Sequence, residues 1–149
     1  MESIISSYNT FLVVMAVIAI LVFIALQFFE AGYGYLFDRR YGRPIPNKVG
    51  WVLMESPVFV AMCILWALSP RQWECAPLIF FLLFQVHYFQ RSFIFPLLMR
   101  GNSKMPLGIV FMGMTFNTLN ALMQGGWIFF LAPENYYADW FSRPFIYIG

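Results

Sequence analysis

Residues 84–100 read FQVHYFQRSFIFPLLMR, and this stretch determines how the rest of the chain is interpreted. It places His87, Tyr88 and Arg91 within a run that is otherwise apolar enough to lie in a membrane. His87 and Arg91 are four residues apart and share one face of a helix, with Tyr88 one step around it. Because lipid does not solvate polar side chains, we expect all three to face a protein interior or a wet cavity and to mark a functional site.

The composition is that of an integral membrane protein. Of the 149 residues, 61% are hydrophobic, 21% are aromatic and only 11% are charged, whereas a soluble domain carries about 25% charged residues. The net charge of +2 and the absence of a basic run argue against a nucleic-acid partner. Cys63 and Cys75 lack the spacing of a metal site, so we expect packing roles and no metal.

Four apolar runs predict an all-α bundle of four transmembrane helices within one membrane region, residues 1–149. The runs cover residues 8–29, 51–69, 77–99 and 106–131, and each is long enough for a hydrocarbon core of roughly 30 Å. Residues 144–149 resemble the start of a fifth span, and no β-strand is expected. Pro44 and Pro46 predict an extended first loop, and Pro96 predicts a distortion near the end of the third span.

The distribution of Lys and Arg predicts the orientation. The loops after the first and third spans hold six of these residues, and the opposite side holds two: Arg39, Arg40, Arg43, Lys48, Arg100 and Lys104 against Arg71 and Arg143. The positive-inside rule then places the first and third loops in the cytoplasm and the N-terminus outside or in a lumen. Either a bacterial inner membrane or an endoplasmic reticulum fits this pattern.

This orientation puts Glu55 near the cytoplasmic end of the second span, at the depth of Tyr88 and Arg91 in the third. Asn117, Asn120 and Gln124 follow i, i+3, i+7 and are expected on one face of the fourth span, lining the same cavity.

A phenol beside a buried carboxyl can donate a hydrogen bond to a carbonyl oxygen or protonate a developing enolate. Arg91 suits a phosphate or a carboxylate. The alternative is structural: Glu55 and Arg91 form only an ion pair between spans, and the Asn/Gln face only holds helices together. The residues by themselves predict a polar intramembrane cavity open to the cytoplasm and name no reaction.

Longer segments resemble the steroid 5-alpha-reductase family. The resemblance rests on the pattern HYxxRxxxxPxLMRG at residues 87–101, and it extends in the same order over YGRPIP, WVLMESPVFV, FNTLNALMQG and ADWFSRPFIYIG. It covers most of the chain from Tyr41 onward. The pattern is long and rich in uncommon residues, which makes a chance match improbable.

The resemblance implies a seven-helix membrane enzyme that transfers a hydride from NADPH to the conjugated double bond of 3-oxo-delta-4 steroids. By position, Glu55 and Tyr88 match the residues that hold and protonate the 3-keto oxygen. Arg91 and Asn120 are expected in the polar network beside the cofactor. The substrate cavity is expected to include His87, Asn117, Gln124 and Phe95.

Departures from the family pattern are Met54, where glutamine is common, and Phe95, where tyrosine is common. The family places most NADPH-binding residues in a C-terminal half, and this chain has no GxGxxG on a strand. We therefore expect an N-terminal, substrate-side portion whose missing half is supplied in cis or in trans. Two other functions stay open: a reductase of another lipidic enone or polyprenol, and a proton-coupled subunit of a small multidrug transporter.

Overall fold

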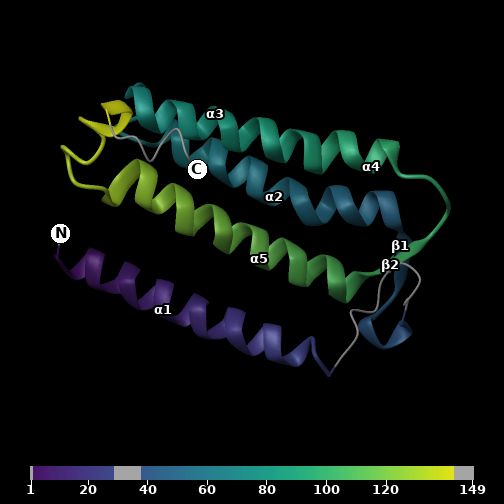
Figure 1. Ribbon diagram of the computed structural model, residues 1–149. Coiled ribbons are helices and arrows are strands. Elements are labelled where there is room, and N and C mark those ends of the chain that lie inside the picture. Colours follow the sequence, from purple (N-terminus) through teal and green to yellow (C-terminus); the bar gives the residue numbers. More distant parts are fainter. Residues whose placement is uncertain (1, 29–37, 143–149) are drawn as a thin grey trace.

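The computed structural model describes residues 2–28 and 38–142 and shows long helices that run alternately up and down (Figure 1). Helix α1 spans Glu2–Ala25 and α2 spans Asn47–Ala67. The next helical rod consists of α3 (Cys75–Phe89), a π-helical turn (Gln90–Ile94) and α4 (Phe95–Leu98). Helix α5 (Leu107–Gly126) is extended by a second π-helical turn, Trp127–Leu131. The short 3-10 helices are Arg39–Tyr41 and Trp140–Ser142. The predicted all-α membrane bundle is confirmed.

Three helical segments are long and apolar enough to cross a membrane: α1, α2 and the rod Cys75–Leu98. The sequence predicted four. Helix α5 forms where the fourth span was expected, but it is not one of the three, because Asn117, Asn120 and Gln124 make it more polar. The boundaries also differ, since α1 ends at Ala25 and α2 already begins at Asn47. The expected fifth span at 144–149 lies outside the described residues.

The expectation of no β-strand was wrong. Strand β1 (Pro44–Pro46) pairs antiparallel with β2 (Lys104–Pro106), and Ile45 lies opposite Met105. Strand β1 confirms the extended path predicted from Pro44 and Pro46 at those residues, but a ladder of three residues has no local sequence signal. The pairing joins the two basic loops at one end of the bundle (Figure 1), as the predicted orientation requires.

Helices α2 and α5 form the most extensive contact between elements. The α5 side of this contact is a stripe of mostly small residues at every fourth position: Gly113, Asn117, Ala121 and Gly125. Such spacing lets helix backbones approach closely in a membrane. A Cβ added at Gly125 would lie 2.7 Å from Leu65 Cδ1, and one added at Gly113 would overlap the Met54 side chain. The stripe therefore fixes the distance between the two helices.

The distortion predicted from Pro96 is present as the π-helical turn just before it. The Phe95 N–H donates to the Gln90 carbonyl, five residues back instead of four. The turn leaves Ser92 fully buried and Arg91 partly exposed, with the Arg91 guanidinium paired to α2. An extra residue in a helical turn is a frequent feature of functional sites.

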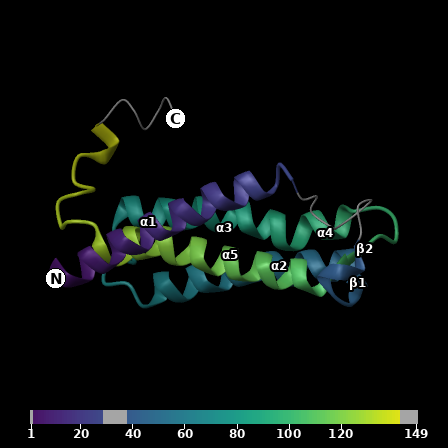
Figure 2. The ribbon, with the colours of Figure 1, turned by 90° about the horizontal axis from the view of Figure 1, so that it is seen from below.

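Helix α1 is held to the bundle mainly through Tyr8 and crosses it at an angle to α5 (Figure 2). Met15 is its one buried residue. The Tyr8 ring stacks on Trp127 at 6.2 Å, and its hydroxyl donates to the Met123 carbonyl. The Trp127 N–H donates to the Gln124 carbonyl, three residues earlier in the chain. The Met123 carbonyl can therefore accept the hydrogen bond from the Tyr8 hydroxyl.

We expect Gly113→Ala to lower the free energy of unfolding by about 1–3 kcal/mol, because the added methyl group overlaps Met54 in a packed interface. The measurement is an unfolding titration in detergent micelles. Gly126→Ala is the matched control, since its Cβ would meet only the Tyr8 ring at an ordinary 3.5 Å. Equal stability of the two variants would show that the stripe does not set the α2–α5 distance.

Candidate active site between α2, α3 and α5

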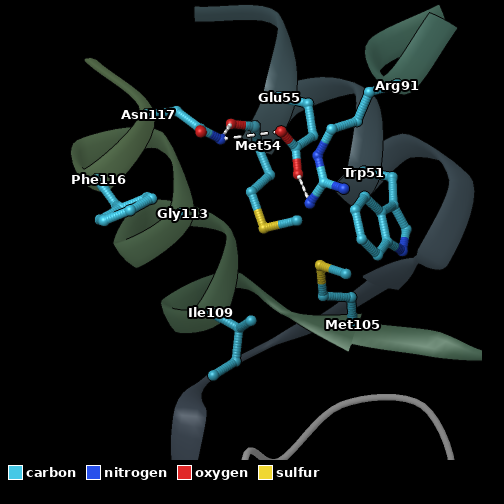
Figure 3. A pocket seen from close by; sticks show the side chains of 9 residues that line it. All are labelled: Trp51, Met54, Glu55, Arg91, Met105, Ile109, Gly113, Phe116 and Asn117. Atoms are coloured by element: carbon cyan, nitrogen blue, oxygen red, sulfur yellow. Dashed lines mark hydrogen bonds and ion pairs between the residues drawn. The ribbon is translucent and has the colours of Figure 1, made fainter. Parts of the chain in front are cut away.

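A pocket of about 240 Å³ opens between α2, α5, the first π-helical turn and β2 (Figure 3). Glu55, Arg91 and Asn117 form its polar side, and the other lining residues are apolar. The lining residues are Trp51, Met54, Glu55, Arg91, Met105, Ile109, Gly113, Phe116 and Asn117.

Glu55 is the buried centre of this pocket, and both of its carboxylate oxygens are paired. Oε1 lies 2.8 Å from Arg91 Nη2, and Oε2 accepts a hydrogen bond of 3.2 Å from Asn117 Nδ2. The same Asn117 nitrogen donates to the Met54 carbonyl at 2.8 Å. A buried carboxylate needs this full set of partners, because an unpaired charge at such a place is strongly destabilising.

The Arg91 guanidinium has one edge against Glu55 and one face against Trp51, with its central carbon 5.3 Å from the ring centroid. The Trp51 ring in turn meets the edge of Phe95 at 5.3 Å. The Arg91 side chain is 44% exposed, so part of its donor set stays available beside the pocket.

Tyr88 belongs to a second polar cluster, between α3 and α5. Its hydroxyl oxygen accepts a hydrogen bond of 3.0 Å from Asn120 Nδ2, and Asn120 Oδ1 accepts one of 2.9 Å from Gln124 Nε2. The Phe84 ring lies 4.5 Å from the Tyr88 ring and His87 lies 5.0 Å from it, edge-on.

The structure thus separates side chains that were expected in one cavity. Asn117, Asn120 and Gln124 were predicted to share a face, but Asn117 turns to α2, whereas Asn120 turns to Tyr88 and Gln124 bonds to Asn120. Tyr88 does not line the Glu55 pocket. His87 is exposed and contacts the Tyr88 ring, and Phe95 is half-exposed behind Trp51.

Five lining residues were not singled out by the sequence analysis: Trp51, Met105, Ile109, Gly113 and Phe116. Trp51 was assigned only to the start of a span, although its position four residues before Glu55 places both on one face of α2. Met105 reaches the pocket because β2 pairs with β1, and no local pattern in the sequence indicates that pairing.

Comparison with known proteins adds to this geometry. The chain is 35% identical over 131 residues to 3-oxo-5-alpha-steroid 4-dehydrogenase 2 of Sus scrofa, which covers 85% of the chain and 50% of the relative. It is 34% identical over 141 residues to Steroid 5-alpha-reductase DET2 of Solanum lycopersicum, covering 90% of the chain and 53% of the relative. The chain belongs to the steroid 5-alpha-reductase family.

No protein-family model matches the chain. The likeness also extends to Steroid 5-alpha-reductase DET2 of Arabidopsis thaliana, at 26% identity over 129 residues. The chain spans about half the length of the curated relatives that it matches.

The two clusters of this family member have different chemical capacities. The Glu55–Arg91–Asn117 cluster presents a fixed ion pair at the wall of a small pocket and can hold a polar group of a ligand by hydrogen bonds. The Tyr88 hydroxyl accepts from Asn120 and donates to none of the residues that the structure describes. A phenol in this state can donate to a carbonyl oxygen.

We expect Arg91→Met to lower the free energy of unfolding by about 3–5 kcal/mol, because it leaves the Glu55 carboxylate buried without its cation. Adding Glu55→Gln to that variant removes the orphaned charge and should restore most of the loss. A double-mutant cycle by unfolding in micelles measures this coupling. Additive losses in the double variant would mean that the ion pair is not the source of the stabilisation.

Proposed function

We propose that this protein is part of an NADPH-dependent reductase of the 4,5 double bond of 3-oxo-delta-4 steroids, and that this chain supplies the substrate end of its cavity. The family membership supports the reaction class. The observation that carries the proposal is the Tyr88 hydroxyl, which Asn120 holds as an acceptor so that its own O–H is free for a carbonyl oxygen.

In the proposed reaction, the Tyr88 hydroxyl donates to the 3-keto oxygen, and Glu55 helps to hold that end of the substrate through the Arg91 and Asn117 donors that it fixes. NADPH, when bound, would supply the hydride for the β-carbon of the enone. The electron pair of the double bond moves toward the oxygen, and the hydrogen bond from Tyr88 stabilises the charge that develops there. Transfer of the phenolic proton gives the enol. A proton from water then adds to the α-carbon while the enol O–H returns its proton to the Tyr88 phenolate, which restores both the ketone and the phenol. The net addition is one hydride and one proton.

Glu55 contributes from a fixed position. Its two oxygens are paired with Arg91 and Asn117, so the carboxylate cannot swing toward the phenol without breaking one of these bonds. The hydroxyl of Tyr88 accepts from Asn120, which keeps the two groups in separate hydrogen-bond networks. In this arrangement Tyr88 is the proton donor, and Glu55 fixes the donors of Arg91 and Asn117 that would orient the carbonyl end of the ligand.

The fit to NADPH is partial within this chain. Arg91 keeps donors open beside the pocket and would hold an anionic or carboxamide group of the cofactor. Asn120, also assigned to the cofactor by the resemblance, already uses its amide on Tyr88 and Gln124. The remaining contacts to NADPH are proposed to come from a further half of the enzyme, in cis or in trans, in keeping with relatives of about twice the length.

The proposed setting is a bacterial inner membrane or an endoplasmic reticulum, with the N-terminus outside or in the lumen. The meeting of the two basic loops at one end of the bundle supports this orientation. The cofactor would then reach the cavity from the cytoplasm.

Tyr88→Phe should lower kcat for a 3-oxo-delta-4 steroid by about 10²–10⁴-fold, the usual contribution of a general acid. NADPH oxidation and reduced product are measured together, on the protein as its gene encodes it. Tyr136→Phe, at the opposite end of the bundle, is the matched control. Full activity of Tyr88→Phe would rule out the acid role.

A panel of lipidic substrates tests the substrate class separately. We expect steroid enones to be turned over faster than other lipidic enones or polyprenols. If one of the latter were reduced and steroids were not, the substrate assignment would be wrong, while the roles of Glu55 and Tyr88 could still be measured with the accepted substrate.

A further inference from the structure

We infer that Gln124 and Asn120 are positioning residues that fix the direction of the hydrogen bond of Tyr88, so that its hydroxyl donates only to the ligand. This inference rests on the proposed function for its catalytic meaning and extends it to two side chains of α5. The structural part, a directed row of hydrogen bonds, stands on the observed contacts.

The row runs in one direction. Gln124 Nε2 donates to Asn120 Oδ1 at 2.9 Å, and Asn120 Nδ2 donates to the Tyr88 hydroxyl at 3.0 Å. Gln124 and Asn120 are four residues apart on α5 and face α3 together. The α2–α5 stripe holds this helix in place, so that position 120 stays within reach of Tyr88.

The direction decides what Tyr88 can do. A phenol has one O–H to donate and lone pairs to accept with. If Asn120 presented its oxygen, it would take up the O–H of Tyr88, and none would be left for a ligand. Gln124 favours the observed orientation, because its N–H group donates to Asn120 Oδ1 and the Asn120 nitrogen then faces Tyr88.

The row also favours donation by Tyr88. Successive hydrogen bonds of the same direction polarise one another, by about 10–30% for each bond. The Asn120 N–H stabilises negative charge on the Tyr88 oxygen as its proton moves to the substrate oxygen. Because an amide cannot accept a proton at its nitrogen in this state, Asn120 assists the transfer without competing for the proton.

The competing acceptor in the neighbourhood is the Glu55 carboxylate, and it is already occupied. Its oxygens are bound by Arg91 and by Asn117, which lies on the adjacent face of α5. Helix α5 therefore has two separate tasks: Asn117 keeps the carboxylate in place, and Asn120 with Gln124 keeps the phenol directed away from it.

The decisive variant is Asn120→Asp, which is nearly isosteric. When the new carboxyl is protonated it can donate to Tyr88, as the amide does, and when it is ionised it can only accept the Tyr88 O–H. We expect kcat of this variant to fall by about tenfold or more, the weight of one ordinary hydrogen bond, as the pH rises through the titration of the new group. KM should change by less than about twofold, since the substrate contacts are retained.

Gln90→Glu is the matched control, because it adds a carboxyl at the start of the neighbouring π-helical turn without touching the row. The titratable and charged side chains around the row are Tyr88 itself, His87, Glu55 and Arg91, and neither variant alters them. Gln124→Met, which removes only the outer donor, should give a smaller loss of kcat with no added pH dependence.

A readout that needs no turnover separates this inference from the proposed function. The tyrosine Fermi doublet in Raman spectra reports whether a phenol donates or accepts, and the Tyr88 signal is obtained as the difference from Tyr88→Phe. We expect that signal to move toward a donating phenol in Asn120→Asp at high pH and to stay unchanged in Gln90→Glu.

An unchanged Tyr88 signal in folded Asn120→Asp at high pH would overturn the inference, and so would a pH profile that matches Gln90→Glu. The proposed function fails independently if Tyr88→Phe keeps its full activity. In that case the Raman measurement still decides whether Asn120 and Gln124 direct the hydroxyl.

Discussion

The carboxylate of Glu55 is the constraint on which the rest of the structure depends. It is buried inside a membrane bundle, where an ionised group persists only with partners at both oxygens. Arg91 and Asn117 meet that need from two other elements, the π-helical turn before Pro96 and helix α5. One carboxylate thereby links three helical segments. Loss of either partner would leave the buried charge incompletely paired, which destabilises the fold.

The small-residue stripe of α5 makes this arrangement possible. Asn117 can reach both Glu55 and the Met54 carbonyl because Gly113 and Gly125 let α5 lie close to α2. Met54 contacts α5 in two ways: its side chain packs on Gly113, and its carbonyl accepts a hydrogen bond from Asn117. A family glutamine at position 54 would need a different fit against that glycine.

The polar clusters on α5 serve different purposes because they face different helices. Both oxygens of the Glu55 carboxylate have a partner, which holds that cluster in place, whereas the Tyr88 cluster ends in a hydroxyl that still has a proton to donate. In the reductase that we propose, the Glu55 cluster would keep the pocket wall in place, and the Tyr88 phenol would respond to the charge that develops on the carbonyl oxygen.

Much of the fold and the identity of the polar residues could be predicted from the sequence. Apolar runs locate helices because length and hydropathy are local properties, and Glu55, Tyr88 and Arg91 stand out because charged and phenolic groups are rare in such runs. Pro96 likewise indicated a distorted helix, since proline cannot donate to the preceding turn. The family pattern was readable for the same reason, as its uncommon residues are close together in the chain.

The pairing of these residues was decided only by the tertiary structure. Spacing placed Asn117, Asn120 and Gln124 on one face, yet a face of a helix is wide enough to meet two neighbours. The crossing of α2 and α3 past α5 determined which side chain meets Glu55 and which meets Tyr88. The β1–β2 ladder and the contribution of Met105 also depend on loops about 60 residues apart, whose contact no local pattern encodes.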